Sequence, residues 1–596
     1  MMQTTRVQST IAGTIVDLCV GVHETVKQGQ VIAIIESMKM EHVVCAVSDG
    51  VVGLFFIGVG DLVQVGSNLC ELNPNANIAA INLQPDQPFQ KNQPNGTPNQ
   101  SLRPDLLATL ERHAQTLDAA RPTAAAKRHA LGLRTARENI TDLCDANSFV
   151  ELGALAYAAQ ESRRPKADLI ANSPADGIVT GIASVGGVQC AVMAYDATVL
   201  AGTQGMRSHQ KTDRLLGIAQ AQVLPVILFA EGGGGRPGDV DMPIVAGLHV
   251  STFAKFAKLS GVVPLIGIAA GRCFAGNAAL FACCDVLIAC VGSNIGMGGP
   301  AMIHGGGLGQ FSPEQIGPAA AQSSNGVIDL LASDEAHAVA MARVLLNTLQ
   351  IKQSPDVFTA TAQTTLREAI PSNRLRSYDA SAIIRTLLDT DTSLELKADF
   401  GLSLITVLGR INGQSIGLMA NSCTHIGGAI DPDAAAKAAS FMKLCQRYAL
   451  PIISLIDTPG FMVGPDIEAL GQVRFAGQLF IQAAKQSEKF IAVVLRKGYG
   501  LGAMAMAAGG FHECTATIAW PTAEFGAMGL EGAVRLGFKK ELDAAQQGPA
   551  RDALFSQLLN DQIAKGGALR MAETLEIDAV IDPAQTRDVL IRLLRN

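Results

Sequence analysis

An internal repeat is the feature that most constrains how this chain can fold. Motifs recur at a constant separation of 226 residues, and the matched positions are Thr180 and Thr406, Gly187 and Gly413, Pro225 and Pro451, Glu231 and Asp457, and Gly276 and Gly502. Chance does not produce a constant offset over nearly a hundred positions, so the body of the chain contains two copies of one fold.

Each copy alternates strands with helices. The apolar pattern of the first copy predicts a strand, a helix, a strand, a further helix and a strand, and the second copy repeats this order (188–194, 205–222, 225–230 and 263–269; 414–420, 432–448, 451–456 and 490–495). A glycine turn then opens another helix in both copies. Such alternation predicts right-handed crossovers and an α/β layered fold.

The residues before the repeat have a different composition. Short apolar runs separated by glycines predict a small all-β module over 1–73. Residues 74–104 are rich in Asn, Gln and Pro, which predicts a flexible linker with a reach of roughly 30 Å. The body then divides into an N-terminal domain, 105–355, and a C-terminal domain, 356–596.

Composition excludes several classes of protein. The chain has 48% hydrophobic residues, yet its most apolar segment is interrupted by Asp285 and is shorter than the ~20 residues that span a membrane. A net charge of -7 without a basic stripe argues against nucleic acid as a partner. Twelve cysteines without a C-x-x-C pair, no apolar leader and no H-E-x-x-H motif predict a cytoplasmic protein with no metal site.

The two glycine turns suggest a chemical role. Two consecutive backbone N–H groups at the start of a helix are free to bind an oxyanion, and glycine lets a substrate approach the backbone closely. The repeat therefore predicts two oxyanion holes, at Gly276-Asn277 and at Gly502-Ala503. Tight strand–helix packing is the alternative explanation. The glycine-rich run at 230–239 is no phosphate loop, because no G-K-[ST] follows.

Lys39 stands out in the N-terminal module. It lies between two β-rich runs, at the expected tip of a hairpin, and is flanked by Met38 and Met40, for which an exposed turn offers no folding reason. The segment Glu36-Ser37-Met38-Lys39-Met40 resembles the biotinylation motif of biotin carboxyl carrier domains, which are flattened β-barrels. The resemblance extends over residues 8–72 and implies that a biotin protein ligase attaches biotin to Lys39.

The body resembles the carboxyltransferase component of biotin-dependent acyl-CoA carboxylases, which has two crotonase-like (ββα spiral) domains. The resemblance covers roughly residues 125–590 and is carried by RTARENITDLCDANSFVELG at 134–153, PLIGIAAGRCFAGNAA at 264–279, LIDTPGFMVG at 455–464 and RKGYGLGAMAM at 496–506. The chain departs from the family in the run Glu231–Arg236, at Asn277, where a glycine is usual, and at Leu501. The last departure leaves the register of the second oxyanion pair open by one residue.

The resemblance implies transfer of a carboxyl group from carboxybiotin on Lys39 to the α-carbon of an acyl-CoA. The pair Gly502-Ala503 would stabilise the ureido enolate left by loss of CO2, and the pair Gly276-Asn277 would hold the thioester enolate. The family's site lies between subunits, which implies a dimer-based homo-oligomer, up to a hexamer. A biotin carboxylase subunit would charge the biotin.

Contacts with CoA are a separate prediction. Arg207, Lys211 and Arg214 share a predicted helix and can meet the CoA phosphates, or they form a solvated basic face. Two alternative functions stay open at this point. One is a decarboxylase component that runs the transfer in reverse, and the other is a crotonase-type hydratase or hydrolase that uses Glu231 or Asp457.

Overall fold

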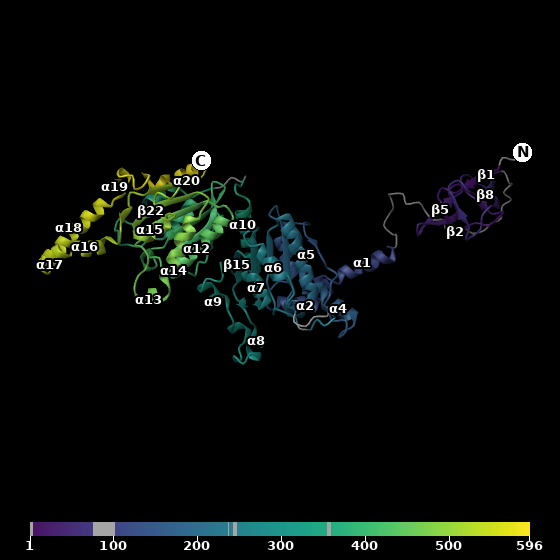
Figure 1. Ribbon diagram of the computed structural model, residues 1–596, viewed down its shortest axis with the longest axis horizontal. Coiled ribbons are helices and arrows are strands. Elements are labelled where there is room, and N and C mark those ends of the chain that lie inside the picture. Colours follow the sequence, from purple (N-terminus) through teal and green to yellow (C-terminus); the bar gives the residue numbers. More distant parts are fainter. Residues whose placement is uncertain (1–3, 75–101, 237, 242–246, 355–358, 596) are drawn as a thin grey trace. The chain divides into compact units, whose positions relative to one another are not determined.

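The computed structural model describes residues 4–74, 102–236, 238–241, 247–354 and 359–595. These residues form two compact units, one up to residue 74 and one from residue 102 (Figure 1). The predicted linker over 74–104 lies largely outside the described residues. Helix α1 (Pro104–Ala114) begins at the last residue of that range. No helix in the described part of the chain is long and apolar enough to cross a bilayer.

The first unit is made of β-strands alone. One four-stranded sheet contains β1 (Thr5–Gln8), β8 (Asn68–Asn73), β6 (Gly50–Phe55) and β3 (Thr25–Val26), and the other contains β5 (Met40–Cys45), β4 (Val31–Ser37), β2 (Gly13–Leu18) and β7 (Leu62–Val63). Alternate apolar residues of these strands, among them Val7, Ile15, Ile35 and Leu69, are fully or almost fully buried. Their burial holds the module together, and the all-β prediction is confirmed.

The first half of the body is built on a seven-stranded sheet. Its strand order is β17-β15-β13-β12-β11-β10-β9, with bounds Leu330–Ala332, Val286–Cys290, Leu265–Ala269, Val226–Phe229, Val188–Tyr195, Ile178–Val185 and Val150–Glu151. From β11 to β17 the pairs are parallel, and every residue of β12, β13 and β15 is buried. Because both faces of the sheet are buried at these strands, their sequences are continuous apolar runs rather than alternating apolar and polar residues.

The second half repeats this architecture. Its sheet has the order β18-β19-β20-β21-β22-β23-β25, with bounds Leu394–Leu396, Leu404–Ile411, Gln414–Asn421, Ile452–Thr458, Phe490–Tyr499, Ala516–Ala519 and Ala579–Val580, and β24 (Glu524–Gly526) pairs with β22. Helix α12 (Pro432–Arg447) follows β20 as α5 (Met206–Gln222) follows β11. The predicted repeat of strands and helices is confirmed.

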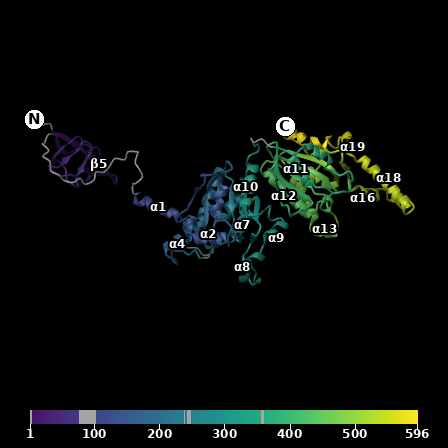
Figure 2. The same ribbon diagram turned by 180° about the vertical axis from the view of Figure 1, so that it is seen from behind.

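The two halves share a core rather than packing as separate bodies. Helix α10 (Glu335–Gln350) contacts β15 and β17 of the first sheet and β19 and β20 of the second, and Figure 2 shows it between the halves. The Tyr448 hydroxyl donates a hydrogen bond to Asp285 across the junction, 2.5 Å. Lys397 pairs with Asp329 across it as well, 2.9 Å.

A clamp of one aspartate and one arginine also recurs, at a different offset; it is partly exposed in the first half and buried in the second. Asp145 accepts hydrogen bonds from both backbone N–H groups at the tip of the β10–β11 hairpin and pairs with Arg343, 3.0 Å. Asp389 does the same at the β19–β20 hairpin and pairs with Arg587. The two clamps are 244 residues apart. The duplication therefore extends beyond the stretch of constant offset, because the first copy has extra residues before that stretch and the second copy has extra residues after it.

One insertion forms an arm in the second half. Helices α16 (Leu530–Gly537), α17 (Lys539–Ala544) and α18 (Pro549–Lys565) extend away from the sheet in both views (Figures 1 and 2). None of the 17 residues of α18 is buried. At the equivalent point after its β16 strand (Asn294–Gly296), the described part of the first half has the short helix α8 (Pro300–Gly305) and a single 3-10 turn (Pro313–Gln315).

Candidate active site

Lys39 lies at the tip of the β4–β5 hairpin. Ser37 pairs with Met40, so Met38 and Lys39 form a two-residue turn in which both have positive φ, 53° and 67°. Two left-handed residues are the geometry of a type I′ hairpin turn. Met38 is 96% exposed, and no hydrogen bond or ion pair among the described residues engages the Lys39 side chain. The turn therefore presents a free amine, which fits the attachment of biotin.

The first glycine turn opens helix α7 (Gly276–Ala282), after a short strand β14 (Arg272–Phe274) that the sequence did not predict. Gly276 and Asn277 are the first two residues of the helix, where N–H groups have no partner within the helix. A Cβ atom on Gly276 would lie 2.2 Å from Oε1 of Gln204. Glycine is therefore the residue that fits at this position.

The Asn277 side chain does not face the turn's open side. It is fully buried, its Nδ2 donates to the carbonyls of Gly202, 3.3 Å, and Glu231, 3.0 Å, and its Oδ1 accepts from the N–H of Gly234, 3.0 Å. The amide thus joins the first turn to the glycine-rich loop 231–236 that follows β12.

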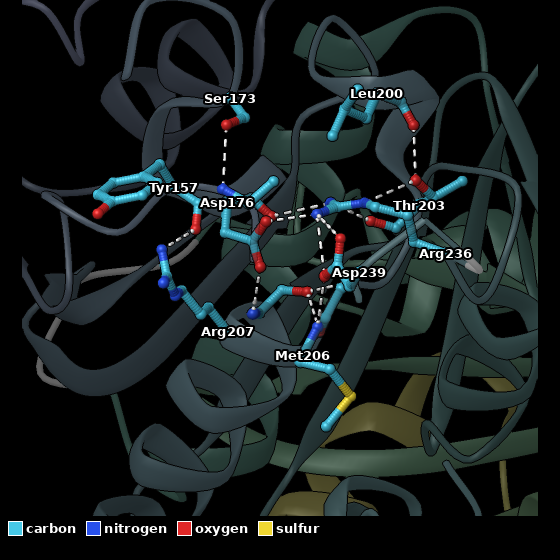
Figure 3. A network of polar contacts seen from close by, with 12 residues as sticks. Tyr157, Ser173, Asp176, Leu200, Thr203, Met206, Arg207, Arg236 and Asp239 are labelled. Atoms are coloured by element: carbon cyan, nitrogen blue, oxygen red, sulfur yellow. Dashed lines mark hydrogen bonds and ion pairs between the residues drawn. The ribbon is translucent and has the colours of Figure 1, made fainter. Parts of the chain in front are cut away.

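A buried ionic network holds the other side of this loop (Figure 3). The Arg236 guanidinium lies between Asp176 and Asp239 and donates to the Thr203 carbonyl, 2.8 Å. Asp176 and Asp239 also accept hydrogen bonds from N–H groups in the first turn of α5, 2.6 and 2.9 Å. The arginine of the GGGGR run is therefore structural, and its partner Asp176, 60 residues earlier, carries no sequence signal that would have identified it.

The second glycine turn differs in register from the first. Helix α15 (Gly500–Met506) begins at Gly500, so its free N–H groups belong to Gly500, Leu501 and Gly502. Ala503 is the fourth helical residue, whose N–H in a regular helix bonds to the carbonyl preceding the helix. A Cβ atom on Gly502 would lie 2.7 Å from the Gly460 backbone. The geometry therefore favours donors at or before Gly502 over the expected Ala503.

A cavity of about 540 Å³ lies beside this second turn. Gly498 and Gly500 line it, together with Phe511 and Phe525, whose rings meet edge to face at 5.6 Å. Met504 and Met571 add apolar surface, and the polar lining residues are His512, Glu513 and Glu576. The second turn thus opens beside a mostly apolar space.

Glu231 and Asp457, which follow or end equivalent strands of the two halves, each form an ion pair with an arginine. Glu231 forms a two-point ion pair with Arg128, 2.6 and 2.5 Å, and Asp457 pairs with Arg496, 3.0 Å. Asp457 is fully buried. Neither carboxylate is free to act as a general base, so the hydratase interpretation loses its proposed residues.

The structure does not gather the three predicted CoA contacts into one anion site. The Lys211 ammonium donates to the backbone carbonyls of Ala175 and Ile178, and burial lowers its pKa to about 8. Arg207 stacks on the Tyr157 ring, 4.4 Å, and binds Glu161. Only Arg214 is exposed with no hydrogen bond or ion pair to another described residue. These contacts hold the Lys211 ammonium inside the fold, so they favour a structural role over a phosphate contact.

Comparison with known proteins assigns the class. Residues 127–595 match the family model of the carboxyl transferase domain, and residues 4–72 match that of the biotin-requiring enzymes. The chain belongs to the carboxyl transferase family. It is the carboxyltransferase of a biotin-dependent acyl-CoA carboxylase, fused to its own biotin carrier domain, and biotin is its covalent cofactor.

Individual relatives agree with this assignment. The chain is 32% identical over 473 residues to the methylmalonyl-CoA carboxyltransferase 12S subunit of Propionibacterium freudenreichii subsp. shermanii, covering 77% of this chain and 88% of that protein. The crystal structure of transcarboxylase 12S, described as a hexamer assembly, matches with a TM-score of 0.73 at 28% identity, over 84% of this chain and 96% of that one.

A further solved structure matches both units. It is a single-chain, multi-domain long-chain acyl-CoA carboxylase, with a TM-score of 0.80 and 47% identity over 99% of this chain. The present chain spans 56% of the length of that protein.

Proposed function

We propose that Lys39 carries the transferable group and that the two glycine turns bind the oxygens on which charge develops. The observation that carries the proposal is a free lysine on a two-residue hairpin tip, in a chain whose body presents two helix starts with unpaired N–H groups. Biotin attached to Lys39 would carry the carboxyl group that is transferred, after a biotin carboxylase has carboxylated it.

The first turn is assigned to the acyl-CoA. The N–H groups of Gly276 and Asn277 would hold the thioester oxygen while the α-proton passes to the ureido nitrogen of the biotin on Lys39, because negative charge then moves onto that oxygen. Losing one such donor typically costs about 3–4 kcal/mol of transition-state stabilisation. Gly276 is partly exposed, so a thioester can approach its backbone.

The second turn is assigned to the group that Lys39 delivers. Its donors are the N–H groups of Gly502 and the preceding residues, which the start of α15 at Gly500 leaves without helical partners. The neighbouring, mostly apolar pocket offers room for the delivered group beside these donors. Among the basic residues of α5, Arg214 has the exposure that a CoA-phosphate contact needs.

The identity of the acyl-CoA follows as a proposal from the neighbouring structures. We infer long-chain acyl-CoA as the first class to test, because the 47% identical neighbour acts on that class and covers carrier and body together. A biotin carboxylase and a biotin protein ligase are the expected partners of Lys39. A hexamer, as in the 12S structure, is the expected assembly, and light scattering after gel filtration measures it.

Intact mass spectrometry tests the carrier assignment. After coexpression with a biotin ligase, the wild-type chain should gain the mass of one biotin, and Lys39→Arg should gain none. Lys27→Arg is the matched control, since this second lysine of the carrier lies outside the hairpin tip and should leave biotinylation intact. A wild-type chain that stays unmodified, or a Lys39→Arg chain that is still biotinylated, would overturn the assignment.

Transfer assays then test the substrate. The biotinylated chain with a biotin carboxylase is offered acyl-CoAs from acetyl to palmitoyl, and the ratio of kcat/KM values defines the preference. A preference for short chains would remove the long-chain proposal and leave the carrier assignment standing.

A further inference from the structure

We infer that the side chain of Asn277 is a positioning residue for the first turn: it ties the glycine-rich loop 231–236 to the start of α7 and so sets the direction of the two N–H donors. The inference rests on the proposed role of that turn in binding the thioester oxygen. It concerns the amide side chain, which is distinct from the backbone N–H of the same residue.

The contacts of the amide support a tether between three segments. Asn277 binds the carbonyls of Gly202 and Glu231 and the N–H of Gly234, and no other hydrogen bond among the described residues uses these three groups. The segments are too close together for another side chain. A Cβ atom on Gly232, for example, would lie 2.0 Å from the Gly202 carbonyl oxygen. Three backbone groups, two of them on the buried residues Gly202 and Gly234, therefore depend on one amide.

The turn itself needs an external support. Helix α7 has only seven residues, and the residue before it, Ala275, has φ 52° and ψ −121°, a conformation that costs energy for a residue with a Cβ. Such a conformation persists when its surroundings hold it in place. Ala275 has the glycine-rich loop directly against it, since a Cβ atom on Gly234 would lie 2.6 Å from the Ala275 Cβ.

Gln204 links the same loop to the donor positions. Its backbone N–H donates to the Gly234 carbonyl, 2.7 Å, while its Oε1 lies beside Gly276. The Gln204 Nε2 is held by the Tyr195 hydroxyl, 3.0 Å. The loop, Gln204 and the turn are thus connected to one another, and the buried Asn277 amide bonds directly to the loop from the turn. A shift of the loop would turn the two donors away from the thioester oxygen.

Substitutions at Asn277 test this inference, because the backbone donor remains in every variant. Asn277→Ala should lower kcat for acyl-CoA carboxylation about 10- to 100-fold with KM for acyl-CoA changed less than threefold, since misplaced donors weaken transition-state binding more than substrate binding. Asn277→Asp should retain more activity. A buried carboxyl beside two carbonyl oxygens favours its protonated form, which can donate to one carbonyl and accept from Gly234. Its kcat should fall as the pH rises.

A binding measurement separates this inference from the proposed function. A nitroethyl thioether of CoA has an anionic nitronate that mimics a thioester enolate, and it needs no biotin to bind. Wild type should bind it at least about tenfold more tightly than a saturated acyl-CoA. Asn277→Ala should lose that preference and keep its affinity for the acyl-CoA.

Ser184→Ala is the control for a general loss of stability. This hydroxyl donates to Asp145, 2.7 Å, at the hairpin end of β10, so the variant should lower the melting temperature without changing kcat or the nitronate preference. A wild type without a preference for the nitronate would contradict the proposed role of the turn. A wild type with the preference and an Asn277→Ala variant that keeps both kcat and preference would overturn the positioning role.

Discussion

The two halves of the body keep the same scaffold and differ at the turns that the chemistry would use. Lys211 and Lys437 occupy equivalent positions 226 residues apart. Each donates to two backbone carbonyls at or just before the start of a strand, β10 in the first half and β19 in the second. Burial lowers the pKa of both lysines to about 8. The hairpin clamps of Asp145 and Asp389 are likewise equivalent.

The glycine turns have diverged within that scaffold. In the first half an amide side chain, Asn277, connects turn and loop, whereas the matched residue of the second half is Ala503, which cannot bond. There the backbone packs directly, with Gly502 against Gly460, and Thr458 Oγ1 accepts from the Gly460 N–H, 3.1 Å. Contacts that stabilise the fold are thus retained in both copies, while the contacts around the glycine turns are specific to each.

The largest effect is expected from a side chain at the second turn. Gly502→Val would place its Cβ against the Gly460 backbone, which cannot move aside as a side chain can. Carboxyl transfer should fall by about 10³-fold or more, because the helix start and its donors are displaced. Steady-state assays on the biotinylated protein measure the loss.

Biotin incorporation at Lys39 is the internal control for that variant, since the carrier forms a unit of its own and should be modified normally. Full transfer activity in Gly502→Val would show that this turn is not used.

A smaller, repairable effect is expected at the first turn. Gly276→Ala would place its Cβ against Gln204 Oε1, the end of a flexible side chain. The variant should lose about 10- to 100-fold in kcat, and the double variant Gly276→Ala/Gln204→Ser should recover part of it by removing the clash.

The matching glycine of the second half provides a comparison for this pair of substitutions. A second-site change cannot relieve Gly502→Ala in the same way, because its collision is with backbone. Equal recovery in both halves, or none in the first, would contradict the difference between side-chain and backbone packing.

The smallest effect concerns the shared scaffold. Lys437→Met leaves the carbonyls of Phe400 and Leu404 without their donor, and this loss should cost about 1–3 kcal/mol per buried group. The melting temperature should fall by about 2–4 °C per kcal/mol. Lys211→Met should behave in the same way in the first half.

Lys443→Met, an exposed lysine on the same helix as Lys437, should stay within about 0.5 kcal/mol of wild type. Thermal melting followed by circular dichroism measures all three variants. If only one of Lys211→Met and Lys437→Met lowered the melting temperature, the two lysines would not play equivalent structural roles.

The sequence by itself determined the features that are local or repeated. Strands, helices and glycine turns recur at a fixed spacing, and the hairpin around Lys39 is specified by the β-rich runs beside it. Periodicity and turn chemistry act over a few residues, so they can be read along the chain. Because the pattern occurs twice, the layered fold and the presence of a helix after each glycine turn could be predicted.

Only the tertiary structure decided what each polar group does. Arg128 forms an ion pair with Glu231, which lies 103 residues later in the chain. The Lys211 ammonium bonds to backbone carbonyls inside the fold, and Asn277 bonds to backbone groups up to 75 residues away. Helix α15 begins two residues before the glycine that the repeat had marked. Such choices depend on which buried donors and acceptors the fold brings together without water, and that pairing is a property of packing rather than of local sequence.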